Sequence, residues 1–162
     1  MLGSEAASAQ SAQKFEIPLQ KPPREVERGE LFRVIVVNVK SPAKFFVQLQ
    51  SEHSALTALM DALDEDMEAA LHLEHFDSSL PVAPMRGLYV AARWPRDENW
   101  YRTKVVGIAS NTHVTLSFID YGDECEVEWK SVRKLPPFFQ QLPAQALKAK
   151  LLGVHPNSEV KV

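Results

Sequence analysis

The chain contains very little cysteine and no long apolar run. Its single cysteine, Cys125, cannot close an internal disulfide, and the flanking acids Glu124 and Glu126 disfavour a reactive thiolate. No run of about 18 apolar residues is present, so we expect no helix that inserts into a membrane. Residues 1–13 contain no basic residue, whereas a signal peptide begins with one. A redox enzyme, a membrane protein and a secreted protein are therefore disfavoured.

Basic residues are slightly fewer than acidic ones. The 18 Lys and Arg residues are outnumbered by 21 Asp and Glu residues, which gives a net charge of -3. Acids predominate between residues 97 and 128, which opposes the binding of phosphate. An RNA-binding module remains an alternative, because basic residues recur in and around this region: Arg86, Arg93, Arg96, Arg102 and Lys104.

The usual signs of catalysis are missing. The chain has no Gly-rich phosphate loop, no nucleophile elbow and no H-E-x-x-H pattern. His72 and His75 lie three residues apart at the end of an expected helix, and a surface or capping role suits them better than a metal site. We therefore expect no enzymatic activity, no metal and no cofactor.

The N-terminal half predicts a linker, a hairpin and a helix. Residues 1–28 have linker composition and are expected to be disordered. Two β-rich runs, 32–39 and 45–49, flank a Ser-Pro break and predict a hairpin. Residues 54–71 predict an amphipathic helix that packs on its own domain, with residues 146–154 as the expected partner. Its apolar stripe comprises Leu56, Leu59, Met60, Leu63, Met67 and Leu71.

The C-terminal half predicts a small β-barrel. Short strands separated by turn signals are expected over 88–93, 100–106, 113–119 and 124–129. A short helix is expected over 130–134, and residues 141–152 are expected to run from helix to strand and return to the hairpin.

The most informative pattern is a group of aromatic residues beside a glycine turn. The motif N-W-Y-R starts at Asn99, and F-I-D-Y-G-D starts at Phe118, about one hairpin later. This spacing places several rings and carboxylates at the rim of a sheet. Such a group suits a pocket for an organic cation.

These motifs resemble the Tudor domain family, and the flanking segments resemble its extended form. The resemblance implies a mainly β fold with helices (α+β), in which a Tudor SH3-like β-barrel is joined to a partial OB or staphylococcal-nuclease-like unit. The implied parts are a linker over 1–28, the start of the OB-like unit over 29–85, the barrel over 86–136 and an incomplete return segment over 137–162. The motif F-E-I-P at Phe15 is similar to the start of the Tudor-KH/Papi branch, but four residues do not assign the chain to one branch of the family.

The resemblance also implies a binding site for methylated arginine. The aromatic residues that form this site in the family correspond to Trp94, Tyr101, Phe118 and Tyr121. Asp123 stands where the family commonly has Asn, and its carboxylate is expected to bind the guanidinium. Because a carboxylate favours the unmodified side chain, we expect only a mild preference for symmetric dimethylarginine.

The other residues near the motif are assigned structural roles. Trp100 and Trp129 are expected in the core, and Asp120 is expected to bond turn amides. Because the rings are placed at a rim, Phe118→Ala and Tyr121→Ala are both expected to abolish binding and to leave the fold intact.

By resemblance, the chain is a non-enzymatic adaptor module. The implied partners are Arg-Gly or Arg-Ala peptides, such as PIWI protein N-termini in the piRNA pathway, and the implied locations are cytoplasmic germ granules or the mitochondrial surface. Unmethylated arginine peptides and spliceosomal proteins are the other partners that the family allows.

Overall fold

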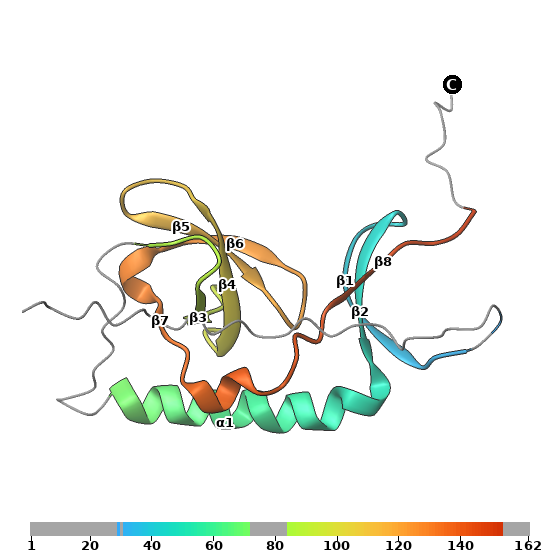
Figure 1. Cartoon of the computed structure of the whole chain (residues 1–162), viewed down its shortest axis with the longest axis horizontal. Coiled ribbons are helices and arrows are strands. Elements are labelled where there is room, and N and C mark those ends of the chain that lie inside the picture. The colour runs from blue at the N-terminus through green and yellow to red at the C-terminus, as the bar shows by residue number, and fades with distance from the viewer. Residues whose placement is uncertain (1–28, 30, 72–83, 154–162) are drawn as a thin grey trace, which may run out of the picture.

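The computed structural model describes residues 29, 31–71 and 84–153, which form two antiparallel sheets and one long helix (Figure 1). The larger sheet has the strand order β6-β5-β4-β3-β7 and the smaller one β1-β2-β8. The expected fold, mainly β with helical parts, is confirmed. The linker over 1–28, the two histidines His72 and His75, and residues 154–162 lie outside the described residues.

The larger sheet occupies the predicted barrel region. Its strands are β3 (Tyr89–Arg93), β4 (Trp100–Ile108), β5 (His113–Phe118), β6 (Glu124–Glu128) and β7 (Arg133–Lys134). Alternate residues of β5 are buried, as the period of two in its sequence predicts. The short helix expected over 130–134 is confirmed in its first part, as a single 3-10 turn, η2 (Trp129–Ser131), but the last two residues of that range form β7. Extended backbone is needed at β7 because it pairs with β3.

The smaller sheet joins the two ends of the described chain. The predicted hairpin is confirmed as β1 (Val34–Ser41) and β2 (Lys44–Leu49). The predicted return of the chain is also confirmed, because β8 (Leu147–Ala149) pairs with β2. The helical part of that return is wrong: the only helical turn nearby among the described residues is η3 (Pro137–Gln140), which precedes it.

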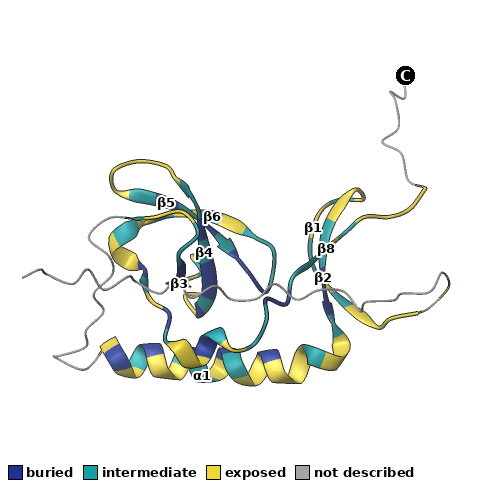
Figure 2. Ribbon diagram, viewed as in Figure 1, coloured by how far each residue is buried: buried dark blue, intermediate teal, exposed yellow. Residues whose placement is uncertain are grey.

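The long helix α1 (His53–Leu71) follows a 3-10 turn, η1 (Gln50–Glu52), and runs beneath both sheets (Figure 1). Figure 2 shows its buried stripe facing the sheets, and most of the predicted stripe residues are buried. Leu71, which is 43% exposed, lies outside the stripe, and Ala70 completes it. The cluster that covers the stripe includes none of residues 146–153, the described part of the expected partner. The stripe packs instead against the barrel and the segment after it: Tyr89, Ala91, Trp100, Ile119, Leu135, Phe139 and Ala144.

Several contacts hold the hairpin against the barrel, and two of them involve β2. The Nε2 group of Gln48 on β2 donates a hydrogen bond of 2.6 Å to the Asp120 carbonyl. Gly122, with φ +79°, lies directly against the ring of Phe46, and a Cβ built on it would overlap that ring. Glycine is therefore required here for its backbone angle and for the close approach of the two sheets.

Gly122→Ala is expected to destabilise the protein far more than Gly87→Ala. Both glycines have positive φ, but a Cβ on Gly87 meets nothing within 4 Å. Both variants bear the left-handed backbone penalty, so their difference reports the overlap with Phe46, which we expect to cost about 1–3 kcal/mol. Thermal unfolding of the two variants measures it. Equal losses would show that Phe46 moves aside without cost.

Candidate functional site: an aromatic cage between the sheets

Four aromatic side chains converge where β3 and β5 end and β4 begins. Trp94 follows β3, Tyr101 lies near the start of β4, Phe118 ends β5, and Tyr121 lies in the turn after it. Because β3 and β5 both pair with β4 antiparallel, these positions meet at one edge of the barrel. The structure thus brings together all four rings that the sequence predicts.

The rings meet edge to face. The Phe118 ring centroid lies 4.4 Å from that of Trp94 and 5.7 Å from that of Tyr101. Tyr101 and Tyr121 are 5.4 Å apart at an angle of 89°. Phe118 is only 2% exposed, so it forms the floor of the cage, and its placement at a rim is wrong. Phe118→Ala is therefore expected to destabilise the fold rather than to leave it intact.

A tight turn holds Tyr121 and Asp123 close to Phe118, the residue that forms the floor of the cage. The amides of Tyr121 and Gly122 donate to the Phe118 carbonyl at 3.2 and 2.8 Å, and the Phe118 amide donates to the Asp123 carbonyl at 2.8 Å. The positive φ of Gly122 allows the chain to reverse here. The F-I-D-Y-G-D motif is thus the local cause of the cage geometry.

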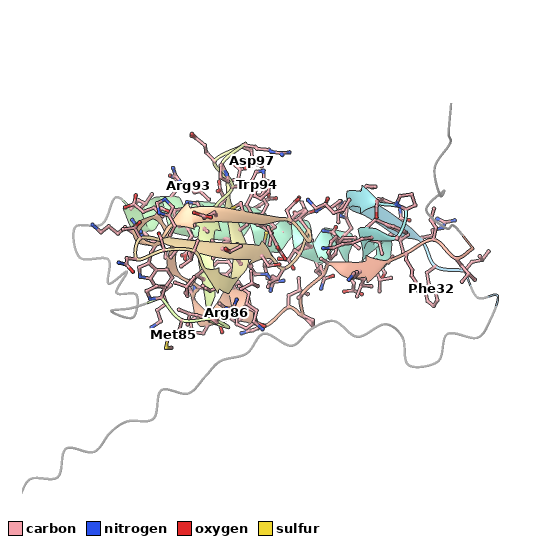
Figure 3. All side chains as sticks on the ribbon, turned by 90° about the horizontal axis from the view of Figure 1, so that it is seen from above. Phe32, Met85, Arg86, Arg93, Trp94 and Asp97 are labelled. Atoms are coloured by element: carbon pink, nitrogen blue, oxygen red, sulfur yellow. The ribbon has the colours of Figure 1, made fainter. Side chains whose placement is uncertain are left out.

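The loop between β3 and β4 supplies the opposite wall. Figure 3 shows Trp94 and Asp97 together at this loop. The Trp94 amide donates to the Asn99 carbonyl at 2.9 Å, which closes the loop at its base. The Asp97 carboxylate accepts a hydrogen bond of 2.7 Å from the Tyr101 hydroxyl, while the Arg96 guanidinium lies 5.7 Å from the Trp94 ring centroid. Asp97 thereby orients the Tyr101 ring.

The cage encloses a cavity of about 150 Å³. This is smaller than the pockets of about 300–1,000 Å³ that hold whole small molecules, as suits a single side-chain head group. Burial and the hydrogen bond to Asp97 raise the pKa of Tyr101, and burial and the charge of Asp120 raise the pKa of Tyr121. Both phenols therefore stay neutral at physiological pH. The lining residues are Val37, Trp94, Arg96, Asp97, Tyr101, Phe118, Tyr121 and Asp123.

The hairpin contributes two residues that sequence reasoning missed. Val37 lines the cavity, at a register shift of β1 between Val36 and Asn38. Such bulges re-aim a side chain. The Lys40 ammonium lies 2.8 Å from Oδ1 of Asp123, which is the fifth predicted site residue. Nothing local in the sequence marks these contacts, because the two ion-pair partners are 83 residues apart.

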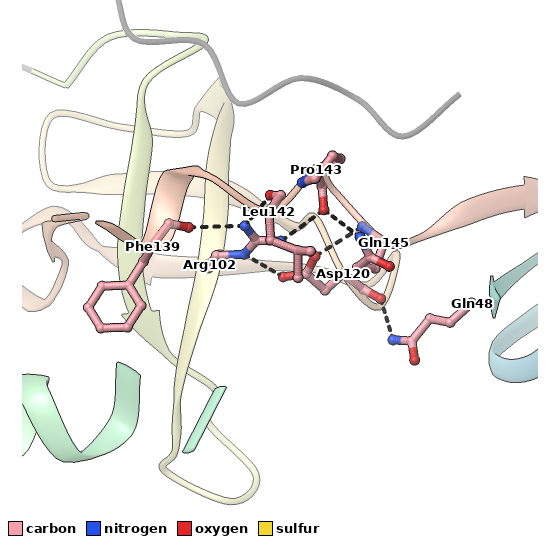
Figure 4. A network of polar contacts seen from close by, with 7 residues as sticks. All are labelled: Gln48, Arg102, Asp120, Phe139, Leu142, Pro143 and Gln145. Atoms are coloured by element: carbon pink, nitrogen blue, oxygen red, sulfur yellow. Dashed lines mark hydrogen bonds and ion pairs between the residues drawn. The ribbon is translucent and has the colours of Figure 1, made fainter. Parts of the chain in front are cut away.

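Arg102 and Asp120, which adjoin the cage residues in sequence, form a buried network of polar contacts (Figure 4). The guanidinium bonds both carboxylate oxygens, at 2.9 and 2.6 Å, and its remaining donors reach three carbonyls, those of Phe139, Leu142 and Pro143. Asp120 also accepts from the Gln145 amide at 3.0 Å. The structural role predicted for Asp120 is right, but its partners are Arg102 and Gln145 rather than turn amides. Arg102 is 1% exposed, so it cannot contribute to an RNA-binding surface.

The other tryptophans occupy the places predicted for them. Trp100 is buried in the core beneath the barrel, where its Nε1 donates to Glu68 on α1 at 2.7 Å. Trp129 is half-buried and packs against the interior of the barrel. Neither lines the cage cavity.

An acidic groove runs beside the cage, between α1 and the start of β4. It encloses about 400 Å³ and shares Tyr101 and Tyr121 with the cage. Its acidic side chains are Asp61, Asp64 and Glu65. A cationic ligand in the cage therefore meets negative charge on the helix side as well.

Residues 29, 31–71 and 84–153 contain neither a membrane-crossing helix nor a metal cluster. No helix in these ranges is long and apolar enough to cross a membrane. The same ranges hold no group of three or more His, Cys, Asp or Glu side chains placed to bind a metal ion.

Comparison with known proteins supports the resemblance. The Tudor domain family model matches residues 26–153. The human Tudor and KH domain-containing protein is 30% identical over 158 residues, which cover 96% of this chain but only 26% of that protein. The chain thus spans about a quarter of that relative's length.

Solved structures show the same fold. The extended Tudor domain of human TDRD1, in complex with a symmetrically dimethylated peptide, matches with a TM-score of 0.70 at 24% identity, over 88% of this chain and 67% of that one. A Papi extended Tudor domain from Drosophila melanogaster, bound to a Piwi N-terminal peptide with dimethylated arginine, matches with a TM-score of 0.65 at 29% identity, over 75% and 60% of the two chains.

Proposed function

Because the chain belongs to the Tudor domain family, we propose that it is a non-enzymatic module that binds peptides through a methylated arginine in the aromatic cage. The convergence of Trp94, Tyr101, Phe118 and Tyr121 around one small cavity carries this proposal. The preferred ligand is symmetric dimethylarginine.

The chemistry of the cage suits a delocalised cation. Methylation removes N–H donors from the guanidinium and adds apolar surface, so the modified side chain depends on ring faces rather than on hydrogen bonds. Each well-placed ring contributes about 0.5–2 kcal/mol to the binding of a cation. The neutral phenols of Tyr101 and Tyr121 keep their ring faces available for this role.

The surroundings favour an arginine-rich peptide as the partner. The acidic groove begins at Tyr101 and Tyr121, so it would attract the basic residues that flank the modified arginine. PIWI protein N-termini with Arg-Gly or Arg-Ala repeats have this composition, so we propose them as the partners, with germ granules or the mitochondrial surface as the location. An RNA strand is disfavoured by the same acids.

Calorimetric titration with matched peptides tests the proposal. We expect the wild-type protein to bind a peptide with symmetric dimethylarginine more tightly than the same peptide with lysine in its place. Tyr121→Ala removes one wall of the cage and is expected to weaken binding about tenfold or more, since a ring face contributes up to about 2 kcal/mol. The melting temperature should change little, because Tyr121 is only partly buried.

Phe138→Ala provides the matched control. Phe138 is another aromatic residue, but it is 62% exposed and does not line the cage. Its loss should leave peptide affinity unchanged. Wild-type protein that binds neither peptide, or that binds a single-stranded RNA in preference to both, would contradict the proposal.

A further inference from the structure

Lys40 brings a positive charge to the edge of a cage that is proposed to bind a cation. Its ammonium is 2.8 Å from Oδ1 of Asp123, and the two side chains are 46% and 29% exposed. Asp123 lines the same cavity as the rings, so a guanidinium in the cage meets a carboxylate that is already paired. We propose that Lys40 sets the methylation preference of the cage by forming an ion pair with Asp123. This inference rests on the proposed function.

An unoccupied Asp123 would favour unmodified arginine. The free guanidinium carries five N–H donors, and a carboxylate accepts them in strong, charge-assisted hydrogen bonds. Each methyl group removes one donor, so the carboxylate gains least from the dimethylated side chain. Ring faces act in the opposite direction, because methyl groups add apolar surface that packs on them.

Lys40 weakens the attraction of the Asp123 carboxylate for a guanidinium, which is the interaction that favours unmodified arginine. Its ammonium donates to one carboxylate oxygen and offsets the carboxylate charge, so less attraction remains for a second cation. The rings are unaffected and continue to favour dimethylarginine. The mild preference expected from Asp123 alone therefore becomes a stronger one once Lys40 is taken into account.

The fold holds this ion pair in position. Lys40 lies on β1 close to Val37, which itself lines the cavity. The hairpin is anchored next to Asp123, since Phe46 on β2 packs against Gly122. The pair is thus presented by two elements in direct contact.

The other charged residues of the cage lie on the opposite loop. The Asp97 carboxylate accepts hydrogen bonds from the Tyr101 hydroxyl and the Asn99 amide, and Arg96 stacks near Trp94. Neither contact involves Lys40. A change at Lys40 therefore acts on Asp123 without altering the hydrogen bonds that orient the rings.

The test is a titration of Lys40→Met with two matched peptides, one with unmodified arginine and one with symmetric dimethylarginine. We expect the variant to gain affinity for the unmodified peptide by about two- to fivefold more than for the dimethylated one, the range that exposed ion pairs supply. Lys44→Met is the matched control. It removes one exposed positive charge from the same hairpin, so it reports the general effect of charge and should change both affinities equally.

A double variant makes the test specific. In the Asp123→Asn background, Lys40→Met should no longer change the ratio of the two affinities. An unchanged ratio in Lys40→Met alone, with dimethylated peptide still bound and Tyr121→Ala still weakened, would overturn this inference and leave the proposed function standing. Failure of the wild-type protein to bind either peptide would overturn both.

Discussion

Replacing Arg102 with methionine is expected to lower the free energy of unfolding by about 3–5 kcal/mol, the usual cost of leaving a buried ion-pair partner alone. Arg102 and Asp120 are 0% and 1% exposed at their side chains, so water cannot replace the lost partner. The carbonyls of Phe139, Leu142 and Pro143 would lose their donors as well. The melting temperature should fall by about 10 °C or more for a domain of this size.

Two further variants separate the hydrogen bonds from the charge. Arg102→Lys keeps the positive charge but has three donors instead of five, so it should also destabilise the protein. Lys134→Met removes an exposed positive charge from β7 and should have little effect. A melting temperature for Arg102→Lys equal to that of the wild type would show that charge alone matters in this network.

The network also explains how the cage is supported. Asp120 lies in the turn between Phe118 and Tyr121, and Arg102 immediately follows Tyr101 on β4. The ion pair therefore ties together the two segments that carry three of the four rings. It connects both to the return segment through Gln145 and the three carbonyls. Loss of the network is expected to loosen the cage as well as the fold.

Most of the barrel was predictable because its signals are local. The alternation of Val114, Leu116 and Phe118 marks β5, and turn residues mark its ends. The helix stripe was equally visible in the spacing of Leu56, Leu63 and other apolar residues. The surface that this stripe packs against could not be predicted, because periodicity identifies a buried face without identifying what covers it.

The rings of the cage and Asp123 were predictable, but the ion pair between Asp123 and Lys40 was not. The motif places Tyr121 and Asp123 by a local turn, so their positions follow from the sequence. Lys40 reaches Asp123 only through the packing of two sheets, which no local pattern encodes. Arg102 was misjudged for a similar reason, since the burial of its guanidinium depends on carbonyls about 40 residues further along.

Phe118 contributes to the stability of the fold and is proposed to contribute to the binding of ligand. Its ring forms the floor of the cage and is nearly inaccessible to solvent. Phe118→Ala is therefore expected to cost about 3–5 kcal/mol of stability, as truncation of a buried phenylalanine usually does. Its effect on binding cannot be separated from its effect on folding by this variant alone.

Phe118→Leu separates the two effects. Leucine keeps most of the buried volume, so the loss of stability should stay below about 1.5 kcal/mol. It removes the ring face and the edge-to-face contacts with Trp94 and Tyr101. Affinity for the dimethylarginine peptide should consequently fall about tenfold or more in a protein that remains folded, since one ring contributes up to about 2 kcal/mol.

Leu116→Ala is the matched control for this experiment. Leu116 lies on the same strand and the same face as Phe118, is fully buried and does not line the cage. Its truncation should cost about 2–5 kcal/mol of stability and leave the affinity of the folded fraction unchanged. Calorimetry below the melting point of each variant makes the comparison. Wild-type affinity in Phe118→Leu, or an equal loss of affinity in Leu116→Ala, would show that the Phe118 ring supports the barrel without contributing to recognition of the cation.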